Sequence, residues 1–280
     1  MNICRFDDNR TGIVRGQTVH DLTRFIGASD AEPVLVALEK VKSVSERDLA
    51  AMPTLPLASV KLLSPIRRPG KILAAPDNYR AHSAEMQADT GASFGRVPTS
   101  LDKAGLFLKA PSSLVGSSAG VTRRFPERRT DYEVELVAII GQAASDIAPE
   151  RALDIVAGYA IGLDITVRGT EDRSFRKSLD TYTVVGPWMT GAEDIPDPQA
   201  LTMSLRVNGE RKQHTLLDDM ITDVRGLIAY VSTFGTLLPG DMIFTGTPSG
   251  VGPIKGGDVL LAEIDGIGSM QVDVTEYAGD

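Results

Sequence analysis

The pattern that most constrains the fold is a series of short apolar segments, separated by turn residues, that runs from residue 71 to the C-terminus. An Asn-Gly pair at 208–209 is typical of the tight turns between them. Helical patterns are fewer, at about 79–86, 149–157 and 222–234, and they do not alternate regularly with strands. The chain therefore favours a β-rich α+β core over a doubly wound parallel sheet. The candidate strands read KILAAP, GLFLKAP, YEVELVAIIG, GYAIGLDITV, LTMSLRVNG, DMIFTG, DVLLAEIDG and SMQVDVTEY.

The first 65 residues are expected to form a small N-terminal α/β unit, followed by a larger catalytic unit at 66–280. Short strands are predicted on both sides of a turn at 7–11, and a short helix is predicted from Pro33. Several prolines between residues 52 and 70 indicate an extended connector, because proline cannot continue a helix or donate a hydrogen bond.

Charge and composition argue against several classes of function. The 280 residues carry a formal net charge of −8 and contain no long block of lysine and arginine. Neither nucleic acid nor an anionic membrane surface is therefore an expected partner. The single cysteine, Cys4, cannot form an intrachain disulfide, which suits a reducing compartment. The N-terminus does not resemble a signal peptide, and the run VAIIG is too short to span a bilayer, so we expect a cytoplasmic enzyme.

Two glutamates, Glu133 and Glu135, interrupt the apolar segment YEVELVAIIG. Alternation along a strand places both carboxylates on one face, roughly 7 Å apart, where they repel each other and lose hydration unless a cation neutralises them. Taken alone, the pair is explained more simply by an exposed strand face with solvated side chains. Asp164 counts against that explanation, because it is the one acid in a second apolar segment, GYAIGLDITV. Three carboxylates without a nearby Cys or His suit Mg²⁺, Mn²⁺ or Ca²⁺, and not Zn²⁺.

A second set of residues has the chemistry of acid–base catalysis. His82 and Glu85 share one face of a predicted helix, where the carboxylate can hold the imidazole as a general base. An incidental histidine on a surface helix is the simpler alternative. Residues 87–105 are small, polar and poorly periodic, as expected of either a plain loop or a lid. Lys177, in a polar segment, would ordinarily be a solvated surface lysine.

Five longer segments occur in the order typical of one enzyme family: TDYEVELVAIIG, VAGYAIGLDITVRG, FRKSLDTYTVVGPW, LRVNGERKQ and TLLPGDMIFTGTPSGVG. Over about residues 62–275 the sequence resembles the fumarylacetoacetate hydrolase family, and in particular its short bacterial members. The resemblance implies a mixed β-sandwich roll that assembles as a homodimer. It also implies that Glu133, Glu135 and Asp164 are the ligands of a divalent metal.

The same resemblance implies catalytic roles. The segment NYRAHSAE matches the family pattern NYxxHxxE, whose His–Glu pair activates water, so this role passes to His82 and Glu85. Lys177 would stand beside the metal and stabilise a developing enolate or oxyanion. Residues 87–105 would form a lid that becomes ordered when ligand binds.

Supporting roles also follow from the resemblance. Thr181, in the Asp-Thr pair of the family, would support the outer shell of the metal. Arg168 would bind a substrate carboxylate or support the metal site, although a straight strand places it about 13 Å from Asp164. Its participation therefore requires the chain to bend after Thr166. The implied substrate contacts are Tyr79, Arg168, Gln213 and Thr247.

The sequence departs from the family pattern at three places. Leu163 stands where many relatives have asparagine, APDNY replaces VGxNY, and the segment RGTEDRSFRKS is more charged and lacks the QW that often precedes the lysine. The metal ligands are intact. The departures therefore bear on the size and polarity of the substrate.

The combined features predict a metal-dependent hydrolase that cleaves a carbon–carbon bond in an acylpyruvate-like 1,3-dicarbonyl acid. The alternatives on the same scaffold are an isomerase of hydroxymuconate-type diacids and an oxaloacetate decarboxylase. A non-catalytic protein with structural Ca²⁺ would leave His82, Glu85 and Lys177 without a role. The glycines of TGTPSGVG do not indicate a nucleotide site, because the GK[ST] ending of a phosphate-binding loop is missing.

Overall fold

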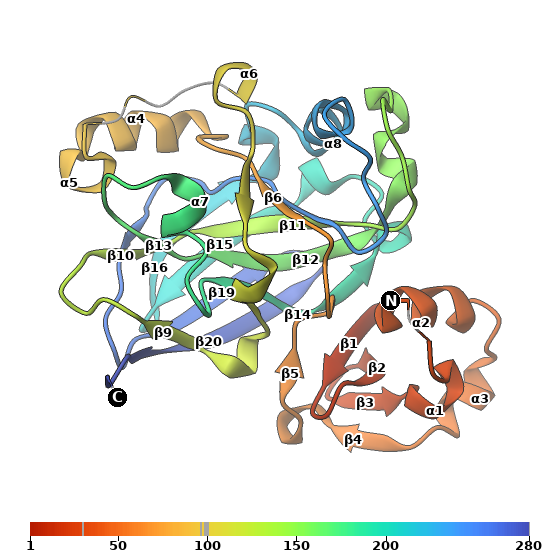
Figure 1. The fold of residues 1–280 in the computed structure, drawn as a ribbon. Coiled ribbons are helices and arrows are strands. Elements are labelled where there is room, and N and C mark those ends of the chain that lie inside the picture. The colour runs from red at the N-terminus through yellow and green to blue at the C-terminus, as the bar shows by residue number, and fades with distance from the viewer. Residues whose placement is uncertain (30, 96, 98–100, 280) are drawn as a thin grey trace.

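A long mixed sheet runs through the computed structural model, which describes residues 1–29, 31–95, 97 and 101–279 (Figure 1). In spatial order its strands are β4 (Thr54–Pro56), β3 (Thr18–Asp21), β2 (Arg10–Arg15), β1 (Asn2–Phe6), β14 (Thr183–Gly191), β12 (Val156–Asp164), β11 (Val134–Ile140), β17 (Met242–Phe244), β6 (Ile72–Ala74) and β7 (Phe107–Lys109). Two further strands lie off this path: β5 (Leu62–Leu63) pairs with β1, and β8 (Leu114–Val115) pairs with β14.

Two smaller sheets complete the β structure. One contains β13 (Thr166–Val167), β10 (Thr130–Tyr132) and β18 (Gly252–Pro253). The other contains β16 (Glu210–Leu216), β15 (Thr202–Val207), β19 (Val259–Ile264), β20 (Gly268–Glu276) and β9 (Val121–Arg123). Each of the eight candidate segments contains an observed strand, and the β-rich α+β architecture is as predicted. Strands β14 and β16 were not predicted, because Gly and Pro interrupt the first and the second is polar and largely exposed.

The helices are short. The α-helices are α1 (Thr23–Ile26), α2 (Pro33–Val41), α3 (Glu46–Ala50), α4 (Arg80–Ala88), α5 (Thr90–Ser93), α6 (Leu101–Ala104), α7 (Arg173–Arg176) and α8 (Val224–Ser232). The 3₁₀ helices are Leu57–Ser59, Pro111–Ser113, Ser117–Ala119, Pro149–Ile155, Ala192–Asp194, Pro198–Ala200 and Leu217–Asp219. The helix expected at about 149–157 is present as the 3₁₀ helix Pro149–Ile155, and it ends two residues early because strand β12 begins at Val156. Within the described ranges, none of the helices is long and apolar enough to cross a membrane.

Strand β11 is buried on both faces, which explains its uninterrupted apolar run. Leu136, Ala138 and Ile140 pack on one face into a core shared with β15, β19, β20 and α8. Val137 and Ile139 pack on the other face against α2 and the neighbouring strands β6 and β17. Two cores therefore hold this strand, and any charged group at its end is fixed within a rigid, largely dry framework.

The N-terminal unit joins the main sheet directly. Strand β1 pairs with β14 through Asn2↔Thr190 and Ile3↔Met189, and β5 pairs with β1 (Figure 1). Its hairpin turn places Asp7 and Asn9 in the left-handed region, where these residue types are tolerated best after glycine. Because the sheet continues from this unit into the rest of the chain, a division at residues 65 and 66 stays a prediction.

Candidate metal centre and active site

Three carboxylates meet where β11 begins and β12 ends. Glu133 lies between β10 and β11, Glu135 is on β11, and Asp164 is the last residue of β12. One ligand oxygen from each lies within 4.8 Å of the others, and all three side chains are buried. The antiparallel pairing of Glu135 with Gly162, followed by a hydrogen bond from Asp164 N–H to the Glu133 carbonyl, brings the strand ends together.

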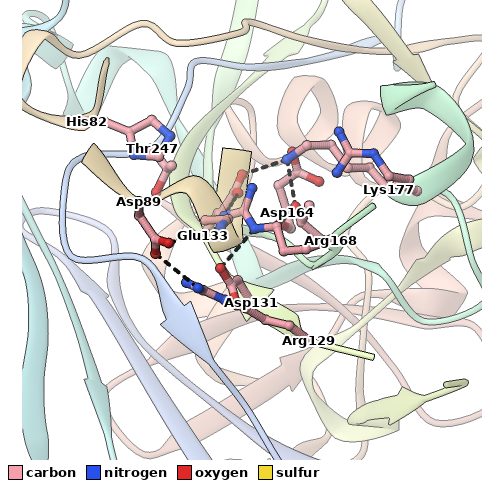
Figure 2. Close-up of polar contacts among 12 residues, drawn as sticks. His82, Asp89, Arg129, Asp131, Glu133, Asp164, Arg168, Lys177 and Thr247 are labelled. Atoms are coloured by element: carbon pink, nitrogen blue, oxygen red, sulfur yellow. Dashed lines mark hydrogen bonds and ion pairs between the residues drawn. The ribbon is translucent and has the colours of Figure 1, made fainter. Parts of the chain in front are cut away.

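Lys177 lies between two of these carboxylates (Figure 2). Its Nζ donates to Glu133 Oε2 and Asp164 Oδ2 at 2.6 Å each, and to Thr166 Oγ1 at 2.7 Å. The side chain is almost wholly buried, so the surface alternative for this lysine is excluded. Lys177 immediately follows α7, whose first turn is capped by the Asp172 carboxylate.

A second buried lysine, Lys109, was not predicted. Its Nζ donates to Asp164 Oδ1 and to the main-chain carbonyls of Lys177 and Tyr182, and the side chain is fully buried at the end of β7. Its sequence signal is a lysine in the apolar strand GLFLKAP. We call Glu133, Glu135, Asp164, Arg168, Lys177 and Lys109 the charged centre.

A chain of ion pairs connects this centre to the junction of α4 and α5. Arg168 donates to Glu133 Oε1 at 3.0 Å and to Asp131 Oδ2 at 2.8 Å. Arg129 then joins Asp131 Oδ1 to Asp89 Oδ2, each at 2.9 Å (Figure 2). Arg168 reaches Glu133 because β12 stops at Asp164 and the chain continues as β13 in a different sheet. The sequence analysis required a bend after Thr166, whereas the chain leaves the first sheet earlier, between Asp164 and Thr166.

The two glutamates differ in electrostatic environment. Burial alone would raise the pKa of Glu133, but the Lys177 and Arg168 charges lower it to about 2. Burial, together with the Asp164 charge, raises the pKa of Glu135 well above its usual range, although the Gly246 N–H donates to its Oε2 at 2.6 Å. Lys177 and Lys109 donate to Glu133 and Asp164 and not to Glu135, so the negative charge at Glu135 is the least neutralised of the three. A cation bound by the three carboxylates would neutralise it. An all-oxygen donor set fits a hard divalent ion.

His82 and Glu85 form the predicted pair on α4. His82 Nδ1 lies 3.2 Å from Glu85 Oε2, and Glu85 Oε1 accepts from Gly250 N–H at 2.9 Å. A carboxylate can only accept, so Nδ1 carries the proton and Nε2 is left as the basic nitrogen. His82 is buried and lines the same cavity as the three carboxylates.

The remaining predicted residues divide into two groups. Arg168 and Thr247 line the cavity of the charged centre. Gln213 lies behind that wall, where its Nε2 donates to Thr247 Oγ1 at 2.8 Å and its Oε1 accepts from Val134 N–H. Tyr79 lines a different depression beside β16, and its hydroxyl has no partner among the described residues.

Thr181 also lies away from the carboxylates in its described contacts. Its Oγ1 accepts from the Thr122 N–H at 2.9 Å, which ties the strand β9 to the turn before β14. The residue has a φ of 70°, an unusual backbone for threonine. Support of the metal's outer shell by Thr181 stays a prediction.

The predicted lid at 87–105 contains the end of α4 and helices α5 and α6. Residues 96 and 98–100 lie outside the described residues. From the described part of this segment, Ala92, Ser93 and Val97 line the cavity of the charged centre, as does Met86 just before it. Ordering of the segment on ligand binding stays a prediction.

The fold and the carboxylate cluster together define a known family. The profile described as fumarylacetoacetate (FAA) hydrolase C-terminal matches residues 71–275, and the chain belongs to this family. A maleylpyruvate hydrolase from Aquipseudomonas alcaligenes is 44% identical over 284 residues, covering 98% of this chain and 99% of the relative.

Solved structures agree with this assignment. The crystal structure of maleylpyruvate hydrolase from Sphingobium sp. SYK-6 is 38% identical and superimposes with a TM-score of 0.87, over 99% of this chain and 100% of that one. A second structure of that enzyme, in complex with manganese(II) ion and pyruvate, gives a TM-score of 0.85 at 38% identity, over 99% of each chain. The family and the fold expected from the sequence are confirmed.

Proposed function

We propose that this protein is a divalent-metal-dependent hydrolase that cleaves the carbon–carbon bond of an acylpyruvate, with maleylpyruvate as the first substrate to test. The observation that carries the proposal is the shared cavity, in which a buried three-carboxylate cluster and the His82–Glu85 pair face the same space. The full-length similarity to maleylpyruvate hydrolases, one of them solved with manganese and pyruvate, supports the same reaction.

Glu133, Glu135 and Asp164 would hold the metal. Mn²⁺ or Mg²⁺ fits the three oxygen donors, and Ca²⁺ is a third hard ion of the same class. When bound, such an ion acts as a Lewis acid that polarises carbonyl oxygens and orients a 2-oxo acid. Arg168 and Thr247 lie in the cavity wall, where they contact the substrate, while Gln213 holds Thr247 in place.

The chain supplies the proton transfers and the charge stabilisation. His82 Nε2 takes a proton from water, while Glu85 holds Nδ1–H and stabilises the imidazolium. The hydroxide oxygen bonds to the acyl carbonyl carbon, and the bond from that carbon to the methylene of the pyruvate part then breaks. The bonding electrons pass to the pyruvate enolate, which the Lys177 ammonium stabilises. A proton returns to the methylene carbon, and the products are a carboxylate and pyruvate.

Assembly and location form part of the proposal. We infer a homodimer, because Leu108 and Phe175 are 53% and 61% exposed and line one apolar depression. Light scattering on the purified protein tests this, and a monomer at micromolar concentration contradicts it.

A cytoplasmic location is proposed because the one cysteine, Cys4, is a buried free thiol.

The decisive experiment is a product assay. The purified protein is stripped of metal and incubated with maleylpyruvate, with and without Mn²⁺ or Mg²⁺, and maleate and pyruvate are quantified. Stoichiometric formation of both, only with metal, is expected. Parallel incubations with oxaloacetate and with an unsaturated keto-diacid detect decarboxylation or isomerisation. Turnover of either of these without hydrolysis of maleylpyruvate would assign the site to the rival chemistry.

A further inference from the structure

A second basic region lies in the cavity wall, on helix α7. Arg173 and Arg176 both line the cavity together with the carboxylates and His82. Arg173 Nη2 donates to Asp77 Oδ2 at 2.8 Å, and Asp77 lines the same cavity. Within the described part of the chain, Nε and Nη1 of Arg173 make no hydrogen bond, so one edge of the guanidinium remains available to a ligand.

The formal charges of the described cavity wall leave room for a dianion. Its carboxylates are Asp77, Glu133, Glu135 and Asp164, and its cations are Arg168, Arg173, Arg176 and Lys177. These four negative and four positive side chains cancel, and the buried Lys109 and Asp131, which pair with Asp164 and Arg168 outside the wall, add one charge of each sign. A divalent metal bound by the three carboxylates therefore leaves an excess of two positive charges. A substrate with two carboxylates balances this excess, whereas a monocarboxylate does not.

The spacing along α7 separates the two ends of such a substrate. Arg173 is the first residue of α7 and Lys177 follows its last residue, so their backbones are separated by about 6 Å along the helix axis, roughly one turn. Lys177 contacts Glu133 and Asp164, which places it at the metal end of the cavity. Arg173 stands one turn away from that end. Arg176 is tied instead to the main-chain carbonyls of Val167 and Glu171.

The contact that holds Arg173 is built from two unusual stretches of sequence. Asp77 belongs to APDNY and Arg173 to RGTEDRSFRKS, the segments in which this chain departs from the family pattern. Asp77 adopts a φ of 47°, a conformation that costs energy for a residue other than glycine and is maintained by its surroundings. Its side chain is largely buried, at 10% exposure, and so fixes the guanidinium in one orientation.

We propose that Arg173, oriented by Asp77, binds the distal carboxylate of a dianionic acylpyruvate and makes the enzyme selective for diacids over acylpyruvates with a neutral acyl group. This inference rests on the proposed function, because the metal end of the cavity must receive the pyruvate part. Asp77 is a positioning residue in this scheme and does not touch the substrate.

The test compares two substrates and two products on the manganese-loaded protein. The variants are Arg173→Gln, Arg173→Lys, which keeps the charge, and the control Arg151→Gln, which removes an arginine of an exposed i,i+3 pair. Steady-state kinetics use maleylpyruvate and acetylpyruvate, whose acyl group ends in a methyl. Calorimetry measures the binding of maleate and of pyruvate without turnover.

For Arg173→Gln we expect KM for maleylpyruvate and the Kd for maleate to rise about 10- to 100-fold, the loss of a hydrogen bond to a charged group. The kcat, the kinetics with acetylpyruvate and the Kd for pyruvate should not change. Arg173→Lys should fall between wild type and Arg173→Gln, and Arg151→Gln should behave as wild type. Equal losses on both substrates, or no loss on maleylpyruvate, overturn the proposal.

Failure of the general function gives a different result. If the wild-type protein hydrolyses neither acylpyruvate, the proposed reaction is wrong. Maleate binding that still depends on Arg173 would then show that the distal carboxylate site exists on its own. Maleate binding that does not depend on Arg173 would overturn the site as well.

Discussion

The charged centre and the N-terminal unit use charge in opposite ways. In the N-terminal unit, Cys4, Phe6, Val14 and Val19 form an apolar core, and an ion pair such as Arg15–Glu46 lies on the surface. In the charged centre, three carboxylates and three cations are buried where two strands end. Exposed ion pairs contribute little to stability, and buried charges cost desolvation. The N-terminal unit is therefore built for stability, whereas the charged centre gives up stability to hold a ligand set.

The largest effect should come from removing a metal ligand. Glu133→Gln replaces a carboxylate ligand by a neutral amide, so both Mn²⁺ affinity and metal-dependent hydrolysis should fall by more than about 100-fold. Loss of a residue that only supports a metal ligand already costs up to about 100-fold, and loss of a ligand itself should cost more. Calorimetric titration with Mn²⁺ and the product assay measure the two quantities. Glu150→Gln, an exposed glutamate, is the matched control. Wild-type Mn²⁺ affinity in Glu133→Gln would remove this residue from the ligand set.

Removal of the proposed general base, His82, should lower catalysis without weakening metal binding. His82→Ala removes Nε2 without touching the carboxylates, so we expect kcat to fall about 10²- to 10⁴-fold, the range for general-base catalysis. Mn²⁺ affinity should stay at the wild-type value. His214→Ala, at an exposed position on β16, should change neither quantity. A parallel loss of Mn²⁺ binding in His82→Ala would contradict the assigned role.

The difference between the two regions also explains what the sequence could predict. Glu133, Glu135 and Asp164 stood out as acids within apolar segments, and the family resemblance then implied that they bind a metal. Lys109 has the same pattern, but a lysine near the end of a strand ordinarily extends its ammonium into water, so it was not singled out. The contact of Asp77 with Arg173 joins residues 96 positions apart and depends on where α7 is placed, which no local pattern encodes. The apolar cores follow from periodicity, whereas the partners of buried charges follow from tertiary structure.

Lys109 tests the stability cost of the charged centre. Lys109→Met leaves Asp164 with one ammonium partner fewer in a dry environment, so the metal-free protein should lose about 3 kcal/mol of unfolding free energy. Urea denaturation in the presence of a chelator measures this value. Lys71→Met is the comparison, because its buried partner Asp241 keeps two main-chain N–H donors, from residues 71 and 238, and should cost less. An unchanged or raised stability in Lys109→Met would mean that the free energy of desolvating this ammonium is at least as large as the stabilisation from its ion pair and hydrogen bonds.

The smallest effect concerns the apolar core of the N-terminal unit. Burial raises the pKa of the Cys4 thiol from 9.0 to about 12. The folded state thus holds the proton more tightly than the unfolded state, so this contribution to stability is complete below pH 9 and is lost as the pH rises towards 12. By pH 10 the loss should be about 1.4 kcal/mol. Because Cys4→Ala has no thiol to ionise, its stability difference from wild type should shift by this amount between pH 7 and pH 10 in urea denaturation. A difference that does not vary with pH would mean that the Cys4 thiolate is hydrated in the folded protein, and the N-terminal core would then admit charge as the charged centre does.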